Sequence, residues 1–439
     1  MNLSRNQIII IAAVGLVVLF FVLVFLCVIP GLKSSCGNPN PSGTTQVSLS
    51  FWGVDNANFI QPVIDEYSKA NKNVAITYRQ FDNPDVYEKA LLNALAINQG
   101  PDILMLNNAW LPKYYDKITP APETFFSLNQ LQQSFPVVVE QDFVLRQAQD
   151  KSLVKIYSLP LYIDTLVLLY NKDIFDAKAI ALAPTTWLEF QNLIPRLRQS
   201  NSFNQIIKSA ASIGGSNKNI DSASDLLALL MKQFGSEMND TNNRVSFGKN
   251  GLSALNFYLQ FANPSSPYYT WSENFPYSLN GLSNGSTAII FNYASQIPLI
   301  KNKNPYLRLG ITPMLQFYNN SQPINYANYW GLTAAKQSKN SGWAWHFIVS
   351  IATNPQIAEV YLQASKRPPA LRTLIEKYKN DPDLGVFSQQ ALTARSWQQP
   401  DSAVVKQTFS DMIESVLNGR LNSNDALSQA ENAINNLTQ

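Results

Sequence analysis

GPDILMLNNAW (Gly100–Trp110) is the stretch that decides the fold, because it places an uninterrupted apolar run between two polar or turn-forming ends. A Gly-Pro pair precedes the run, and two asparagines follow it. Continuous apolar runs of this length are typical of strands that are buried on both faces in a parallel sheet. The stretch therefore predicts a buried strand with polar side chains at its C-terminal end.

The residues before this run alternate between strand-like and helix-like segments. Residues 47–53 and 74–81 have the pattern of short strands, and apolar residues at helical spacing mark the segments 59–67 and 87–96. A β-α-β-α-β order predicts a doubly wound α/β lobe. In such a lobe the ligand crevice lies at the carboxyl ends of the strands.

A second α/β series begins at residues 156–175. A capping box, Thr186-x-x-Glu189, is expected to open a helix there. Helical patterns cover residues 226–234 and 252–261, strand patterns cover 286–292 and 326–335, and the chain after Ser341 is mainly helical. Together these segments predict a second α/β lobe.

The N-terminus carries an apolar run from Ile8 to Ile29 with no charged side chain. A helix needs ~20 residues to cross the apolar core of a bilayer, whereas the apolar part of a secretory signal is usually ~7–15 residues long. We therefore expect residues 1–36 to be a transmembrane anchor and residues 37–46 a flexible linker. A lipid on Cys36 is the alternative, although Lys33 precedes it where such sites favour an aliphatic residue.

Composition argues against several classes of function. Lys and Arg number 33 and Asp and Glu number 30, so the net charge of +3 gives no nucleic-acid footprint. The two cysteines are Cys27 and Cys36, and His346 is the only histidine. A cysteine nucleophile or a His-rich zinc site in the body is therefore excluded. We expect no catalysis, no metal and no cofactor.

Several motifs occur in a characteristic order along the body. They are Gly100–Tyr114, Leu159–Phe175, Ala183–Glu189, Leu282–Ile297, Asn328–Gln356 and Arg367–Leu371. In this order they resemble the family 1 extracellular solute-binding proteins, the group that contains maltose-binding protein. The resemblance covers the chain from Val47 to about Gln399.

The resemblance implies an α/β fold of two doubly wound lobes joined by a hinge, the periplasmic-binding-protein-like fold of type II. We expect lobe 1 to comprise residues 47–160 and 292–332, and lobe 2 residues 161–291 and 333–439. The implied function is to bind a small polar solute, a mono- or oligosaccharide, outside the cytoplasm for an ABC importer. The implied partners are the permease subunits and the membrane, and we expect a monomer.

Sugars are held by aromatic rings that stack on them and by planar polar side chains that pair with their hydroxyls. Residues of these types near predicted strand ends and in loops are the candidate ligand contacts. They are Trp52, Asp55, Asn56, Asn107, Asn108, Trp110, Tyr162, Asp164, Trp271, Asn292, Tyr293, Tyr329, Trp330, Arg367, Arg395 and Trp397. The loop 212–219 (SIGGSNKN) is a further candidate, through its backbone N–H groups.

Other interpretations of these residues stay open. Trp52 could be a core residue beside an ordinary turn, and Asp164 could cap the hinge instead of binding ligand. A membrane-tethered sensor or adhesion module could have the same lobes without a transporter partner. A glycoside hydrolase would need two carboxylates ~5–9.5 Å apart, and no Asp/Glu constellation in the sequence suggests such a pair.

Overall fold

The computed structural model describes residues 46–146, 154–203, 205–240, 244–317 and 322–438. The predicted anchor (1–36), and the predicted linker except for its last residue, lie outside these ranges. Within them, no helix combines the length and the apolar character that a membrane span requires.

The first lobe is built on a mixed sheet with the strand order β2-β1-β3-β14-β4, and β7 also pairs with β14. β1 runs parallel to β2 and β3, whereas β14 is antiparallel to β3, β4 and β7. The strands are β1 (Val47–Gly53), β2 (Val74–Gln80), β3 (Ile103–Asn107), β4 (Ile118–Thr119), β7 (Leu159–Pro160) and β14 (Trp330–Ala335). β3 is buried along its whole length, as its apolar run predicts.

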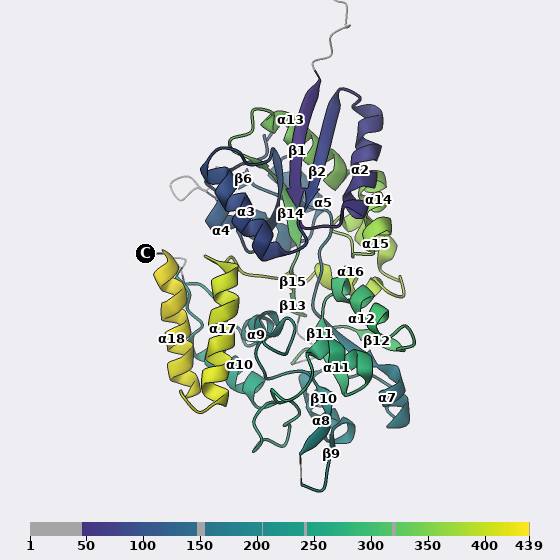
Figure 1. Ribbon diagram of the computed structural model, residues 1–439, viewed down its shortest axis with the longest axis vertical. Coiled ribbons are helices and arrows are strands. Elements are labelled where there is room, and N and C mark those ends of the chain that lie inside the picture. Colours follow the sequence, from purple (N-terminus) through teal and green to yellow (C-terminus); the bar gives the residue numbers. More distant parts are fainter. Residues whose placement is uncertain (1–45, 147–153, 204, 241–243, 318–321, 439) are drawn as a thin grey trace, which may run out of the picture. The chain divides into compact units, whose positions relative to one another are not determined.

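Helices from both ends of the body pack with this sheet (Figure 1). They are α2 (Ala57–Ala70), α3 (Pro84–Ala96), α4 (Leu111–Tyr114), α5 (Leu128–Ser134), α6 (Val137–Phe143), α13 (Ser341–Thr353), α14 (Pro355–Ser365) and α15 (Arg372–Tyr378). Local sequence explains where α3 begins, since the Asn83 side chain accepts the first backbone N–H groups and Pro84 fixes the first turn. A small antiparallel pair, β5 (Val144–Arg146) with β6 (Val154–Ile156), lies beside α6.

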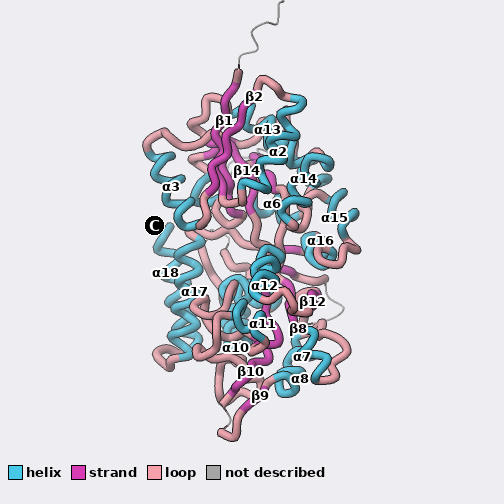
Figure 2. Tube along the Cα trace, turned by 45° about the vertical axis from the view of Figure 1, so that its right-hand side comes forward, coloured by secondary structure: helices cyan, strands magenta, loops and turns pink. Residues whose placement is uncertain are grey.

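The second lobe is built on a five-stranded sheet with the order β12-β8-β11-β10-β9. Only β10 and β11 are parallel among these neighbours. The strands are β8 (Val167–Asn171), β9 (Gln199–Ser200), β10 (Ile206–Ala211), β11 (Thr287–Asn292) and β12 (Leu309–Thr312). Figure 2 shows this sheet in the half of the body opposite to β1 and β2.

The predicted capping box of the second lobe is confirmed. Thr186 accepts the backbone N–H of Glu189 and the Glu189 carboxylate accepts that of Thr186, so the box opens α8. The helical elements of this lobe are α7 (Lys172–Ala177), α8 (Trp187–Leu197), α9 (Ala223–Gln233), α10 (Gly248–Leu259), α11 (Ser278–Asn284), η1 (Ala294–Gln296), α12 (Ile297–Lys303), α16 (Gly385–Ala391), α17 (Ser402–Leu417), α18 (Ser423–Asn435) and η2 (Asn436–Thr438).

The hydrophobic cores divide the chain differently from the boundaries expected from sequence. The residues of the first core come from 49–144, 156–163 and 327–375, together with Ala391 and Ala394. Those of the second lobe come from 166–197, 210–238, 245–315 and 397–434, together with Tyr326 and Phe387. Residues 292–317 and 322–326 therefore belong to the second lobe, because β12 pairs with β8. Residues 333–378 belong to the first, because β14 completes its sheet and α13 packs on β14.

The chain crosses between the lobes three times, near residues 161–166, 326–330 and 379–384, and these segments are called the hinge below. Short pairings tie them together: Thr165 bridges to Ala327, and β13 (Asn325–Tyr326) pairs with β15 (Ala394–Arg395). After β15 the chain enters α17 and α18, which lie side by side in both views (Figures 1 and 2). Residues of the hinge and of α17 therefore lie close to residues of both lobes.

Candidate functional site

A cavity of about 270 Å³ lies between the two lobes, and each lobe supplies part of its wall. The first lobe contributes the start of α3, the residues that follow β3, and Trp330. The second lobe contributes Asn217, the start of α9, Tyr326, Trp397 and the first half of α17. The predicted crevice at the carboxyl end of β3 is therefore part of this cavity.

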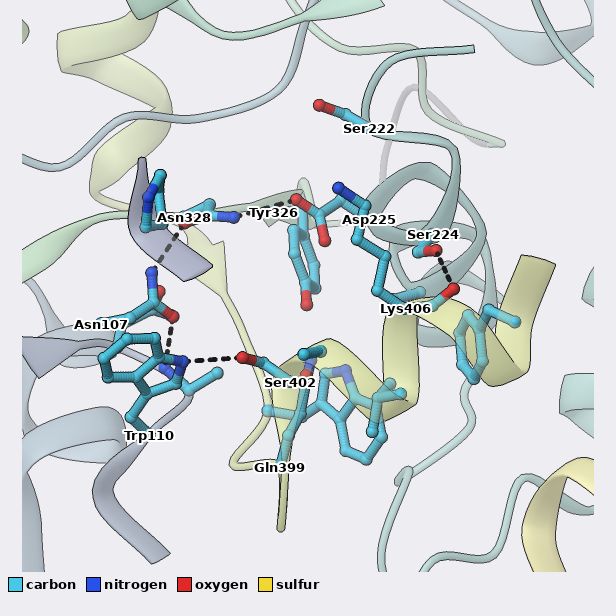
Figure 3. Close-up of a pocket in the computed structure, with 18 of the residues that line it drawn as sticks. Asn107, Trp110, Ser222, Ser224, Asp225, Tyr326, Asn328, Gln399, Ser402 and Lys406 are labelled. Carbon is cyan, nitrogen blue, oxygen red and sulfur yellow. Dashed lines mark hydrogen bonds between the residues drawn. The ribbon is translucent and has the colours of Figure 1, made fainter. Parts of the chain in front are cut away.

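Aromatic rings form the wall on the side of the first lobe. Trp110 stacks on Tyr114 with their ring centroids 5.3 Å apart, and Trp330 meets Trp110 edge to face at 4.9 Å. The indole Nε1 of Trp110 donates to the Ser402 hydroxyl at 2.7 Å, across the gap to α17 (Figure 3). Trp110 is buried and so has a fixed orientation, while Trp330 is only partly buried.

Trp397 lines the cavity from the second lobe. Its ring packs against Phe247 and Phe409 in that lobe's core, and only 3% of its surface is exposed. Of the five tryptophans among the predicted contacts, Trp110, Trp330 and Trp397 line this one cavity, from both lobes. Trp52 is not among the lining residues: its ring lies against Phe81 and under the guanidinium of Arg79.

A chain of amide and carboxylate groups connects the two walls. Asn107 Nδ2 donates to Asn328 Oδ1 at 3.1 Å, and Asn328 Nδ2 donates to Asp225 Oδ2 at 3.1 Å (Figure 3). Asn108, another predicted ligand contact, donates its Nδ2–H to Asp142 Oδ2 at 3.1 Å. These planar groups can pair with adjacent hydroxyls of a ligand.

Two predicted residues lie behind the cavity wall instead of in it. Asn292 Nδ2 donates to Asp221 Oδ2 at 3.0 Å, and the Tyr293 hydroxyl donates to Asp225 Oδ2 at 2.6 Å. They orient the carboxylates of Asp221 and Asp225, which do line the cavity. Burial raises the pKa of Asp225, and the hydrogen bonds from Tyr293 and Asn328 and the charge of Lys406 partly oppose the shift.

A cluster of ion pairs connects the two lobes beside Glu88, which lines the cavity. Lys113 Nζ lies 2.8 Å from Glu88 Oε1 and 2.5 Å from Asp401 Oδ2. Glu88 and Lys113 belong to the first lobe, whereas Asp401 is the N-cap of α17 in the second. Lys113 therefore holds the start of α17 against the first lobe.

Asp55, Tyr162 and Arg367, predicted as ligand contacts, instead form a cluster inside the first lobe. Arg367 Nη1 lies 2.9 Å from Asp55 Oδ1, and the Arg367 guanidinium lies over the Tyr162 ring at 4.2 Å. The Tyr361 hydroxyl donates to Asp55 Oδ2 at 2.7 Å. None of these side chains lines the cavity, and the ion pair and the Tyr162 ring pack together in the interior of the first lobe.

Asp164 has the hinge-capping position that the sequence left as its alternative role. Its carboxylate accepts the backbone N–H groups of Ala294 and Ser295, each at 2.9 Å, where η1 begins. Burial raises the pKa of Asp164 to about 6. The residue thus ties the first crossing segment to a helix of the second lobe.

The remaining predicted residues have structural positions outside the lining. Asn56 caps α2, Trp271 is a core residue whose Nε1 donates to Asn219, and Arg395 lies in β15 beside Ala394. The Tyr329 hydroxyl donates to Asp142 at 2.8 Å. Asp142 is fully buried and also accepts from Ser396, and its burial raises its pKa to about 6. Of the loop 212–219, Asn217 lines the cavity.

Sequence reasoning missed several residues that line the cavity, chiefly Glu88, Asp221, Asp225, Asn328, Ser402 and Lys406. Asp221 and Asp225 carried a usable signal, since they stand at the start of a helix directly after the loop 212–219. Ser402 and Lys406 carried none, because their position depends on how α17 folds back toward the first lobe.

Comparison with known protein families identifies the family of this chain. A family model described as bacterial extracellular solute-binding protein matches residues 63–386. The chain belongs to the bacterial extracellular solute-binding proteins. The resemblance read from the order of the sequence motifs is therefore confirmed.

Solved structures share the fold of this solute-binding protein over nearly its whole length. The sugar-binding protein MalE from Xanthomonas citri has a TM-score of 0.72 at 18% identity, over 89% of this chain and 97% of that one. An ABC transporter solute-binding protein from Thermotoga lettingae, bound with alpha-D-tagatose, has a TM-score of 0.69 at 19% identity, over 90% and 100%. The cyclic alpha-maltosyl-1,6-maltose binding protein from Arthrobacter globiformis has a TM-score of 0.71 at 18% identity, over 89% and 98%. At these identities the likeness establishes the periplasmic-binding-protein-like fold.

Proposed function

We propose that this solute-binding protein is the extracytoplasmic substrate-binding component of an ABC importer and that it binds a mono- or oligosaccharide between its lobes. The observation that carries the proposal is the cavity itself, in which tryptophans from both lobes stand beside planar amides and carboxylates. Rings can stack on the apolar faces of a pyranose while planar polar groups pair with its hydroxyls. Solved structures of the same fold add support, since one is named a sugar-binding protein, one a cyclic alpha-maltosyl-1,6-maltose binding protein, and one is bound with alpha-D-tagatose.

Binding would be coupled to closure of the lobes about the hinge. A ligand that contacts both walls binds the closed state better than the open one, so it shifts the population toward closure. The groups that already connect the walls, such as Asn328 to Asp225 and Trp110 to Ser402, would hold the closed state together. The permease subunits would then recognise this state.

The protein would deliver its ligand without changing it. A hydrolase of this fold would convert a bound saccharide with time, whereas a receptor would release it intact. Chromatography of a saccharide incubated with excess protein distinguishes the two. Conversion that a carboxylate substitution abolishes would establish the hydrolase instead.

The apolar run from Ile8 to Ile29 would tether the monomeric receptor to the cell membrane beside its importer. Its length matches a bilayer span. The intact mass of protein extracted from membranes tests the tether, since an uncleaved chain keeps residues 1–36. A mature N-terminus at an acylated Cys36 would replace the helical anchor with a lipid.

A ligand screen on the full chain in detergent tests the proposed function. Monosaccharides, oligosaccharides, polyols, amino acids and peptides are added in turn, and thermal unfolding is followed. A ligand of the native state stabilises it by about 2.7 kcal/mol at 100 times its Kd. We expect saccharides to raise the midpoint and Trp330→Ala to abolish the rise. Stabilisation by amino acids or peptides alone would overturn the assignment to sugars.

A further inference from the structure

The charges around the cavity are strongly unbalanced. Among the described residues that line it, the carboxylates are Asp85, Glu88, Asp221 and Asp225, and the single amine is Lys406. Lys113 lies next to the cavity, but it is already paired with both Glu88 and Asp401. The wall therefore carries a clear excess of negative charge.

Asp221 and Asp225 are oriented by hydrogen bonds from neutral side chains. Asp221 accepts from the Tyr277 hydroxyl at 2.7 Å as well as from Asn292, and Asp225 accepts from Tyr293 and Asn328. All four donors are neutral, and neither carboxylate has an ion pair within the described part of the chain. The charge of Lys406 lowers the pKa of Asp225 and that of Asp221 raises it, so one ammonium faces two carboxylates here.

A second, independent feature points to a ligand at the same place. The indole Nε1–H of Trp397 has no acceptor in hydrogen-bond geometry within the described residues, although the Tyr326 hydroxyl lies near it. Trp397 is 3% exposed and lines the cavity. A buried hydrogen-bond donor without a partner costs about 1–3 kcal/mol of stability. A ligand oxygen that accepts from the Trp397 N–H would remove this cost.

Closure would make the charge imbalance more costly. Excluding water from the cavity removes the solvent that stabilises the carboxylates, and buried charges are tolerated when they are paired. A neutral ligand would leave Lys406 as the single amine of the lining beside both Asp221 and Asp225. A cationic group between them would neutralise both, and the faces of the tryptophans would also attract it.

We propose that the preferred ligand is a saccharide that carries a protonated amino group, with the ammonium at Asp221 and Asp225 and a ring oxygen or hydroxyl at Trp397. This inference rests on the proposed function, because it specifies the class of sugar that the same cavity binds. It adds a requirement for charge that the proposed function does not contain.

Calorimetric titration of the full chain in detergent tests the inference with matched sugars. Glucosamine, N-acetylglucosamine and glucose are compared, as are the β-1,4 dimers of each. We expect the free amine to bind at least tenfold more tightly than its acetylated and neutral counterparts. Raising the pH until the amine loses its proton should remove this advantage and leave the acetylated sugar unaffected.

Two charge-matched variants locate the effect. Asp225→Asn keeps an oxygen acceptor for Tyr293 and removes the charge, so it should reduce the affinity for the amine to that for the neutral sugar. Asp65→Asn removes an exposed charge on α2 and should preserve the tenfold preference.

The outcomes separate this inference from the proposed function. Neutral or acetylated sugars that bind as tightly as the amine would overturn the inference and leave the proposed function standing. If no saccharide of either kind binds, both fail. An unchanged preference in Asp225→Asn would overturn the assignment of the ammonium to this carboxylate.

Discussion

The Trp110 indole donates its N–H to the hydroxyl of Ser402 at 2.7 Å, and the two residues belong to different lobes. Trp110 follows the buried strand β3, and Ser402 is the first residue of α17. The bond lies at the edge of the cavity, where Figure 3 shows it beside Asn107 and Gln399. It therefore joins the two walls directly.

Removing this bond should loosen the contact between the lobes. Trp110→Phe keeps an aromatic ring and loses the N–H, and Ser402→Ala loses the acceptor. Each should lower the unfolding free energy by about 0.5–1.5 kcal/mol. The double variant should cost little more than either single one, because both remove the same bond. Denaturant unfolding of the four proteins measures the coupling.

Trp345→Phe is the matched control for this cycle. Its Nε1 donates to the Thr119 carbonyl at 3.0 Å within the first lobe. It should lower stability by a similar amount without changing the radius of gyration, whereas Trp110→Phe should increase it. Equal scattering curves for the two variants would show that the Trp110 bond does not hold the lobes together.

The ion pair between Lys113 and Asp401 gives a second prediction about the same contact. Asp401 also caps α17, since its side chain accepts the N–H groups of Ala403 and Val404. Asn caps a helix as well as Asp does, so Asp401→Asn removes the charge and keeps the cap. Asp401→Ala removes both and should cost about 1 kcal/mol more in unfolding free energy.

Affinity is the readout that tests the role of this ion pair in closure. If Lys113 holds α17 against the first lobe, Asp401→Asn should weaken ligand binding and chiefly raise the dissociation rate. Stopped-flow release of a bound saccharide measures that rate. A rate unchanged in Asp401→Asn but raised in Asp401→Ala would assign the effect to the helix cap instead of the ion pair.

Two buried aspartates predict how stability depends on pH. Burial raises the pKa of Asp142 and of Asp164 to about 6 in the folded protein, above the value of about 3.9 expected when unfolded. Between these values the folded state binds more protons than the unfolded state. The contribution of these groups to stability is therefore fully present below pH ~4 and is lost as the pH rises through ~6.

The expected loss is about 3 kcal/mol for each group across that range. Asp142→Asn should remove the pH-dependent contribution of this carboxyl to stability. The unfolding free energy of the variant should therefore fall less steeply between pH 4 and 6 than that of the wild type. Urea unfolding at a series of pH values measures both slopes. Parallel curves for the two proteins would show that Asp142 titrates normally.

The fold followed from the sequence because its signals are local. The continuous run at 103–107 and the capping box at Thr186 each specify one element through nearby residues, and both formed as predicted. The partition of the lobes after Asn292 was wrong, since it depends on which sheet β12 and β14 join. Nothing in either strand's own pattern states its partner.

The cavity residues show the same limit. Asn107 and Trp110 could be predicted because Asn107 ends a recognisable strand and Trp110 lies three residues after it. Asp55 and Arg367 also carry polar side chains, yet they form a buried ion pair with each other although they lie far apart in the sequence. A polar residue near a strand end can face ligand or a buried partner, and only the packing of distant segments decides between them.

The pair of Asp55 and Arg367 gives the last prediction, which separates structural from ligand-binding roles. Arg367→Met leaves the buried Asp55 carboxylate without its counter-ion, so it should lower the unfolding free energy by about 3–5 kcal/mol. Adding Asp55→Asn should recover part of this loss, because no unpaired charge then remains. Arg367→Lys keeps the charge but loses the planar face over Tyr162, so its unfolding free energy should lie between those of the wild type and Arg367→Met. Since neither residue lines the cavity, the affinity of the folded protein for ligand should stay within about twofold in calorimetric titration. A large loss of affinity in Arg367→Lys, with stability preserved, would instead indicate that Arg367 contacts the ligand.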